Sequence, residues 1–317
     1  MREEPAGGGR RDRGKVTGRR PRIGQVLGVS DQTVARRFRR LRHTVRLRVT
    51  GMSDDSRLGR ESWIVRLACT PNVAEQLAAA LARRPDTQYV DLLSGGTEVM
   101  CAMRPRTRRE RDDLLLQRLQ RTPRVISVTA HCVLRTFFGG PMGWLRKTAA
   151  LDPEEEAALR LPPPSPAAGP VVLDAAEESL LAALRRDGRA TLAELEAATG
   201  QSAAAIGRRL ERLRTAGVLY FAVEYDREPL GQGVEAMCWL TCAPYALAEA
   251  GQAVAGHGEV RFAAAVTGRA NLAVLVLCRT TGDLYTYLSE RLGGLTGVQS
   301  VETTLALRRV KALTYAP

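Results

Sequence analysis

Two groups of arginines have the chemistry and the spacing to hold phosphate or guanine. Each group has arginines at positions n, n+1 and n+4: Arg36, Arg37 and Arg40 in one, and Arg208, Arg209 and Arg212 in the other. A guanidinium can donate two parallel hydrogen bonds to a phosphate, or to O6 and N7 of guanine in a major groove. One such group alone is as well explained by a solvated helix face, because arginine favours helices. Two copies after a turn glycine favour a polyanion as partner.

The other reactive side chains form no recognisable catalytic or metal site. Cys238 and Cys242 are four residues apart on an expected strand, a separation of about 13 Å, which is too long for one zinc ion or a disulfide. His131 and Cys132 are adjacent and point to opposite faces of another expected strand. We therefore predict no catalytic residue, no metal site and no cofactor, and expect the cysteines to serve as small apolar side chains.

The arginine groups belong to a long internal repeat. Residues 28–42 match residues 200–214 at an offset of 172, and further matches continue downstream at an offset of 173, such as Cys69 with Cys242. A period of this length indicates a duplicated pair of domains, because solenoid repeats are far shorter.

The positive charge is concentrated at the start of the chain. The whole chain carries +13, and residues 1–60 hold 17 basic and 6 acidic residues. A one-sided basic block indicates a polyanionic partner, although residues 1–18 alone could be a disordered arginine-rich tail. No apolar run is long enough to span a membrane, and the charged first residues do not resemble a secretory signal. We expect a cytoplasmic protein without a membrane partner.

In the second copy, three helices are predicted, with N-terminal caps at Asp174, Thr191 and Ser202. Glu177 completes a capping box with Asp174, and the third helix spans 203–216. An extended segment follows it. A tight turn between the second and third helices, followed by an extended segment, is typical of a winged helix-turn-helix.

The third helix of each copy has an apolar face and a polar face. In the second copy Ile206, Leu210 and Leu213 recur at i, i+4 and i+7 and are expected to face inward. In the first copy the inward residues are Val34, Phe38 and Leu41. The residues expected to face DNA are Ser30, Gln32, Thr33, Arg36, Arg37 and Arg40 in the first copy, and Ser202, Ala204, Ala205, Arg208, Arg209 and Arg212 in the second.

The first copy has no sequence for its first helix. Ile23, Val26 and Leu27 supply a second helix, but Met1 to Gly18 has no apolar stripe. Three explanations remain open: this copy is degenerate, the true start lies upstream, or other contacts supply the missing helix.

Each helix-turn-helix is followed by a β-α-β-β-α-β pattern, which predicts a ferredoxin-like domain. The predicted elements are 63–69, 71–83, 87–93, 98–103, 107–121 and 125–138 in the first copy, and 236–242, 244–254, 260–267, 271–278, 281–292 and 298–309 in the second. Such a sheet has helices on one face only, so its other face needs cover. Alternating residues such as Val65, Leu67 and Cys69, or Met237, Trp239 and Thr241, led us to expect the two sheets to pack together.

The predicted fold class is therefore α+β, with two winged-type helix-turn-helix domains alternating with two ferredoxin-like domains. The expected divisions are 1–60 (basic segment and incomplete helix-turn-helix), 61–145 (first ferredoxin-like domain), 146–170 (proline-rich linker), 171–231 (complete helix-turn-helix) and 232–317 (second ferredoxin-like domain).

At this level of detail the chain resembles the Lrp/AsnC family of bacterial transcription regulators. The resemblance covers about 20–145 and 171–312. It is carried by Leu173-Asp174, Leu180-Leu181, Asp187-Gly188-Arg189, Ser202 to Val218, Asp226-x-x-x-Leu230-Gly231 and Val266-Thr267-Gly268-x-x-Asn271-Leu272, and in the first copy by Gly28-Val29-Ser30, Asp54-x-x-x-Leu58-Gly59 and Ser94-Gly95-Gly96.

The resemblance implies a function and a second site. It implies sequence-specific binding of double-stranded DNA, pairing of the sheets within the chain or in a homo-oligomer, and a small-molecule effector such as an amino acid. The implied effector residues are Ser94, Gly95, Gly96, Thr97 and Glu98 in one copy, and Thr267, Gly268, Arg269 and Asn271 in the other. The family often has an acidic residue in this loop where the second copy has Asn271, and a plain hairpin turn is the alternative reading of Thr-Gly.

Two other functions compete with a regulator that is not an enzyme. Fused double modules of this kind also resemble the siroheme decarboxylases of haem biosynthesis, which would require histidines and arginines around a tetrapyrrole. The chain has only His43, His131 and His257, and it keeps two arginine-rich third helices. The third possibility is a ligand sensor that binds DNA weakly.

Overall fold

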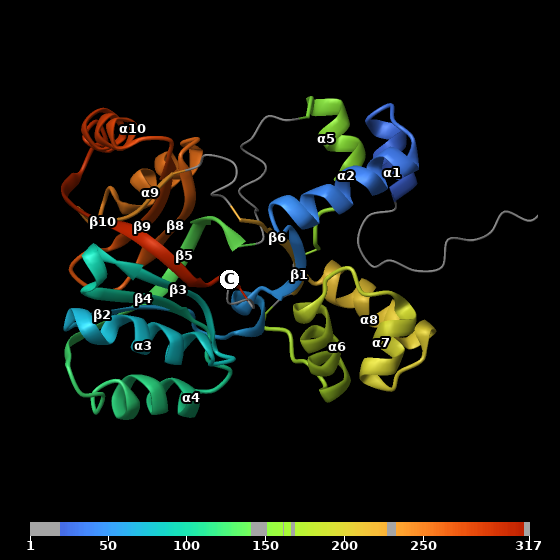
Figure 1. The fold of residues 1–317 in the computed structure, drawn as a ribbon, viewed down its shortest axis with the longest axis horizontal. Coiled ribbons are helices and arrows are strands. Elements are labelled where there is room, and N and C mark those ends of the chain that lie inside the picture. Colours follow the sequence, from blue (N-terminus) through green and yellow to red (C-terminus); the bar gives the residue numbers. More distant parts are fainter. Residues whose placement is uncertain (1–19, 141–150, 161, 166–168, 227–232, 314–317) are drawn as a thin grey trace, which may run out of the picture.

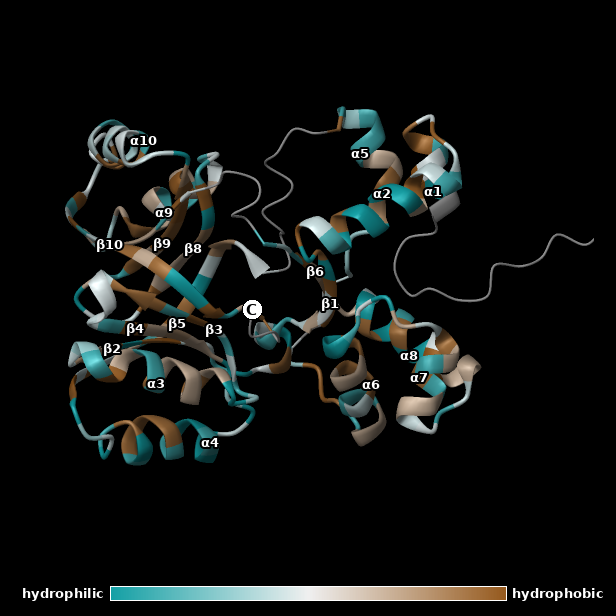
Figure 2. Ribbon diagram, in the orientation of Figure 1, coloured by the Kyte–Doolittle hydropathy of each residue, from teal (hydrophilic) through white to brown (hydrophobic). Residues whose placement is uncertain are grey.

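The computed structural model describes residues 20–140, 151–160, 162–165, 169–226 and 233–313, and it is an α+β protein. Figure 1 shows two parts: a β-barrel with helices on its outside, and a group of small helices joined to it by a two-stranded ribbon. In Figure 2 the barrel strands are mainly hydrophobic, whereas much of the helical part is hydrophilic.

Both predicted β-α-β-β-α-β units are present. The first consists of β2 (Trp63–Cys69), α3 (Pro71–Ala82), β3 (Thr87–Leu93), β4 (Glu98–Met103), α4 (Arg108–Asp112, continued by a π-helical turn Asp113–Arg118) and β5 (Val125–Phe138). The second consists of β7 (Val234–Cys242), α9 (Leu247–Gly256), β8 (Val260–Val266), β9 (Leu272–Cys278), α10 (Thr281–Thr286, continued by a π-helical turn Tyr287–Leu292) and β10 (Val298–Lys311).

The two sheets join into one closed barrel with the strand order β10-β3-β4-β2-β5-β8-β9-β7. The strands that close it pair in equivalent ways: Val133 of β5 lies opposite Val266 of β8, and Ala306 of β10 lies opposite Leu93 of β3. Val133 and Ala306 are 173 positions apart, and so are Leu93 and Val266. The repeat therefore relates the two pairs, and the barrel has an approximate two-fold axis.

The sheets cover each other inside this barrel. Met237 and Trp239 lie in a buried cluster between the sheets, which also includes Ile64, Leu93, Met100, Ala264, Val266 and Ala273. Val65, Leu67 and Cys69 face the helices of their own unit. Both faces of the sheets are therefore covered, as the apolar alternation required.

The helical part has two heads. The first contains α1 (Arg20–Val26) and α2 (Asp31–Thr44), and the second contains α6 (Ala175–Arg186), α7 (Leu192–Thr199) and α8 (Ala203–Thr215). Among the described residues only the second head has a buried core, which includes Leu180, Leu184, Leu195, Ile206 and Leu213. None of the 14 residues of α2 is fully buried. Val34 and Phe38 are half-buried on the predicted inward face, but the expectation for Leu41 is wrong, since it is 42% exposed.

The ribbon is formed by β1 (Arg48–Ser53) and β6 (Leu219–Glu224), which pair antiparallel. Thr50 lies directly opposite Ala222, its own equivalent 172 positions later, so the approximate two-fold axis passes through this pair. Helix α6 packs on β1: a Cβ at Gly51 would come within 2.7 Å of the Leu184 Cβ. The second head is thereby held by the strand that follows the first.

Several boundaries differ from the predictions. The interval 146–170 contains a helix, α5 (Pro153–Leu159), started by a capping box between Asp152 and Glu155. Helix α6 begins at Ala175, directly after its predicted cap Asp174. Helix α9 begins at Leu247, after a turn over 244–246.

Among the described helices, none combines the length and the apolar character that crossing a membrane requires.

Candidate functional site

The second head is assembled by side chains that cap its helices. Thr191 and Glu194 form a capping box at the start of α7, and the Ser202 hydroxyl accepts a hydrogen bond from the Ala205 amide at the start of α8. Such caps satisfy amide groups that have no partner within the helix. Gly200, with a φ of 68°, makes the turn that separates the two helices.

Helix α8 presents the predicted arginine face. Ile206 and Leu213 are fully buried and Leu210 is half-buried, as the apolar spacing predicted. On the other side Ser202, Ala204, Arg208 and Arg212 are exposed, and Ala205 and Arg209 are half-buried.

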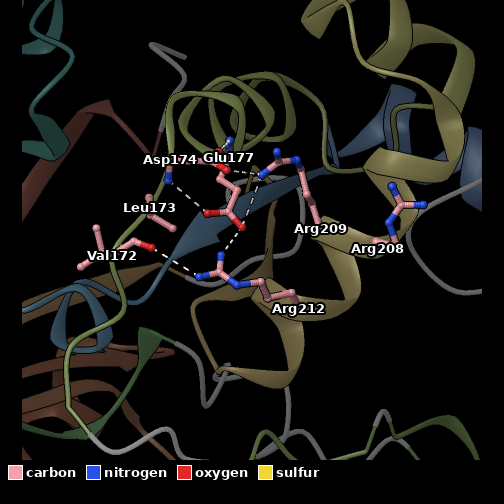
Figure 3. A pocket seen from close by; sticks show the side chains of 7 residues that line it. All are labelled: Val172, Leu173, Asp174, Glu177, Arg208, Arg209 and Arg212. Carbon is pink, nitrogen blue, oxygen red and sulfur yellow. Dashed lines mark hydrogen bonds and ion pairs between the residues drawn. The ribbon is translucent and has the colours of Figure 1, made fainter.

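Two of these arginines are bound to carboxylates of α6. Arg209 Nη1 donates to Asp174 Oδ2 at 2.5 Å and lies 3.8 Å from Glu177 Oε1. Arg212 Nη1 donates to Glu177 Oε1 as well. These residues, with Val172, Leu173 and Arg208, line an open pocket of about 360 Å³ (Figure 3).

Arg208 has no such partner. It makes no hydrogen bond or ion pair with any described residue, and Figure 3 shows it directed away from the carboxylates that hold Arg209 and Arg212. The spacing of three residues between Asp174 and Glu177 matches that between Arg209 and Arg212, but the ion pairs themselves depend on how α6 packs against α8.

The arginines of the first head have no counter-ions among the residues that the structure describes. Ser30 caps α2 by accepting from the Thr33 amide, and Gln32, Arg36, Arg37 and Arg40 are exposed while Thr33 is half-buried. The three guanidinium groups make no hydrogen bond or ion pair within the described part of the chain. Counting back 172 positions from Asp174 and Glu177 gives Arg2 and Pro5. Both lie outside the described residues, as does the whole segment Met1 to Gly18, in which no first helix was expected.

Neighbouring segments support this head from two sides. Arg22 Nε of α1 donates to the Ala158 carbonyl of α5 at 2.8 Å, and Figure 1 shows α5 beside α1 and α2. The Arg189 guanidinium of the second head lies 4.6 Å from the centre of the Phe38 ring. These contacts lie at the first head but leave α2 without a fully buried residue.

The predicted effector loop of the first copy is tied to the barrel interior. Ser94, Gly95 and Gly96 form a tight turn with positive φ angles, closed by Thr97, which donates from its hydroxyl to the Ser94 carbonyl at 2.8 Å. Glu98, at the end of this loop, accepts from Arg66 Nε at 2.6 Å. Its carboxylate therefore already has a cationic partner.

The equivalent loop of the second copy is tied to neighbouring backbone. Thr267 exchanges hydrogen bonds with the backbone of Cys132, at 3.0 Å and 2.9 Å. The Asn271 amide accepts from the Cys242 N–H and donates to the Cys242 carbonyl, each at 2.8 Å. A Cβ at Gly268 would come within 2.8 Å of His131 Nδ1, and Arg269 is exposed. Asn271 thus holds the adjacent strand in place.

A polar cluster that was not predicted from the sequence lies next to Trp239, between the two sheets. Arg66 binds Glu98 and also Glu302, whose Oε1 lies 2.5 Å from Nη2. These bonds raise the pKa of Arg66 above its ordinary value although burial alone would lower it. His131 stacks on Trp239 with ring centres 4.7 Å apart. The signal was an arginine in the middle of the apolar strand 63–69.

The cysteines behave as apolar residues. All six are free thiols, and burial raises the pKa of Cys238 to about 11. Within the described ranges, no three histidine, cysteine, aspartate or glutamate side chains gather as a metal site would require.

Comparison with known proteins places these features in a family. The model of the Lrp/AsnC ligand-binding domain matches residues 62–142 and again 235–315, and a winged helix-turn-helix DNA-binding model matches 173–220. The chain is similar to the HTH-type transcriptional regulator FL11 of Pyrococcus horikoshii, 26% identical over 148 residues, which are 46% of this chain and 97% of that protein. It is 34% identical over 140 residues to the HTH-type transcriptional regulator Rv2324 of Mycobacterium tuberculosis, covering 43% of this chain and 92% of that protein.

A solved structure resembles the chain over nearly its whole length. The siroheme decarboxylase NirDL superposes with a TM-score of 0.59, covering 92% of this chain and 85% of that chain, at 14% sequence identity. At this identity the likeness shows a shared fold only. The two matches to the ligand-binding domain span just over half of the chain and include both barrel halves, and the chain therefore belongs to the Lrp/AsnC family, with two of its modules in one polypeptide.

Proposed function

We propose that the protein is a sequence-specific DNA-binding transcription regulator in which the two heads have different tasks. The observation that carries this proposal is the contrast between α8, on a head with a complete core, and α2, which has no buried residue and no counter-ion for Arg36, Arg37 or Arg40 among the described residues. A folded head can hold side chains in a fixed register on base edges. Arginines without a partner among the described residues, on a helix with no buried residue, are suited to bind phosphates.

We propose α8 as the reading helix and α2 as a contact to the DNA backbone. Residues Ser202, Ala204, Ala205, Arg208, Arg209 and Arg212 form the first surface, and Ser30, Gln32, Thr33, Arg36, Arg37 and Arg40 form the second. The task requires access to DNA, which is the reason for the expected cytoplasmic location.

We propose that an amino-acid effector, if the loops bind one, does so through backbone groups and small side chains of 94–98 and 267–271. Glu98 and Asn271 are already bonded to Arg66 and Cys242. Thermal unfolding in the presence of each amino acid tests this, and an increase in the unfolding temperature that depends on concentration is the supporting result.

We do not favour the enzyme. The space between the sheets, where two modules face each other, is filled by side chains such as Met237 and Trp239. His131 is buried there and bonded to the Thr267 carbonyl. We propose that the chain is not an enzyme, and that its likeness to siroheme decarboxylase reflects the fold alone.

The experiment is a gel shift with genomic fragments at several salt concentrations. We expect binding that weakens linearly on a plot of log K against log salt, with a few fragments enriched. Changing Arg36, Arg37 and Arg40 together to Gln should weaken binding to all fragments alike and reduce the slope by up to about 3. Loss of preference for the enriched fragments, with overall affinity unchanged, would contradict this division of tasks.

A further inference from the structure

The carboxylates that hold the arginines of α8 lie beside the surface proposed to bind DNA. Asp174 and Glu177 begin α6 and contact Arg209 and Arg212, two of the residues proposed for the DNA surface. A carboxylate and a phosphate oxygen compete for the same N–H groups of a guanidinium. Any phosphate that approaches these arginines therefore meets groups that are already bonded.

The two carboxylates differ in exposure. The side chain of Glu177 is 2% exposed, and it both caps α6 and contacts Arg209 and Arg212, so it positions them. The side chain of Asp174 is 54% exposed and lies at the rim of the pocket (Figure 3). The hydrogen bond from Arg209 lowers the pKa of Asp174, which stays ionised at neutral pH.

The first head provides the contrast within the same chain. Arg37 and Arg40 are the equivalents of Arg209 and Arg212, and they have no carboxylate partner among the described residues. Within the described part of the chain, these ion pairs therefore occur at the second head only, the one with a complete core.

We propose that Asp174 is a specificity-determining residue of the second head and that Glu177 is a positioning residue. The Asp174 carboxylate competes with DNA phosphates for Arg209 and so suppresses binding that does not depend on sequence. The free Arg208 and its neighbours on α8 then decide where the head binds. This inference rests on the proposed DNA-binding function.

The test variant is Asp174→Asn in the full chain. Asparagine caps helix N-termini as well as aspartate does, so the start of α6 is kept while the negative charge is removed. Affinity is measured for two duplexes across a range of salt: one enriched by the wild-type protein from genomic fragments, and a scrambled duplex of the same composition.

We expect the variant to bind the scrambled duplex about fivefold more tightly at low salt, because one competing charge is lost. The slope of log K against log salt should become steeper by about 1, as expected for one added phosphate contact. The ratio of the two affinities should fall. Glu249→Gln on α9, an exposed residue of the barrel, makes the same change in net charge and should leave all three quantities unchanged.

Asp174→Ser keeps a capping hydroxyl without a charge and should behave as Asp174→Asn does. Equal or weaker binding of the scrambled duplex by both variants, with the wild-type slope and ratio, would overturn the inference while leaving the proposed function intact. If the wild-type protein bound neither duplex at any salt concentration, the proposed function would fail and the inference with it.

Discussion

Arg66 and Trp239 occupy equivalent positions in the two modules, 173 residues apart, and they are in contact: the guanidinium carbon of Arg66 lies 4.8 Å from the centre of the Trp239 ring. Both lie near the approximate two-fold axis of the barrel, where a symmetric pair would bring identical side chains together. Two arginines there would repel each other, whereas an arginine over an indole ring is attracted to it.

Arg66→Met should lower the free energy of unfolding by about 2–4 kcal/mol, because it leaves the largely buried Glu98 carboxylate without its counter-ion. Urea unfolding followed by tryptophan fluorescence measures the change. Arg308→Ala is the matched control, since its pair with Glu75 is exposed on both sides and should cost less than about 1 kcal/mol. Adding Glu98→Gln to Arg66→Met should recover part of the loss, and a further decrease would contradict this explanation.

The same substitution should change how stability depends on pH. Arg66 lowers the pKa of Glu302 in the folded chain. A lowered pKa contributes stability that is present above the unfolded-state pKa and is lost as pH falls through the folded-state pKa. The difference in unfolding free energy between wild type and Arg66→Met should therefore narrow as pH falls from neutral into the acid range. A difference that stayed constant over a series of urea titrations would show that Glu302 does not respond to Arg66.

Gly51→Ala should loosen the second head from the ribbon. The new methyl group would meet the Leu184 Cβ, and overpacking of this kind costs about 1–3 kcal/mol. Hydrogen exchange should become faster in α6 and β1 and remain unchanged in β2 and β4. Gly256→Ala, at the end of α9 with no atom within 4 Å, should be neutral or slightly stabilising. Unchanged exchange in α6 would show that the contact is not tight.

Arg208→Ala should weaken binding of the enriched duplex by about 1–3 kcal/mol and relax the preference for it, as expected for a side chain that reads bases. Binding curves for the enriched and scrambled duplexes provide the measurement. Arg291→Ala removes one exposed cation from the barrel and should change neither value. An equal loss for both duplexes, with a shallower salt slope, would assign Arg208 to a phosphate instead.

Local patterns determined most of what the sequence could predict. Strands β2, β3, β4 and β5 have the predicted bounds, because their apolar alternation ends at turns formed by proline, glycine or charged residues. The caps at Asp174, Thr191 and Ser202 were also predicted, since a cap and the residue three positions later form a local signal.

Contacts between distant segments could not be predicted in this way. Helix α5 is short and lies in a proline-rich interval, and its contact with Arg22 depends on the tertiary structure. Leu41 is exposed because no buried core surrounds α2 in the described structure. The spacing of apolar residues along α2 could not indicate this. The pairing of Asp174 with Arg209 requires two helices 35 residues apart to be placed side by side. The DNA and effector residues therefore remain predictions on elements whose positions are now known.

The pairing of Thr50 with Ala222 within one polypeptide has a consequence for the DNA itself. Regulators built from two identical chains have identical reading helices, and their operators are correspondingly palindromic. Here α2 and α8 differ in sequence, in the core behind them and in their ion pairs within the described part of the chain. Because both helices belong to one polypeptide, each chain carries one of each. We therefore expect the operator of one such chain not to be a palindrome and to give the bound protein a direction along the DNA.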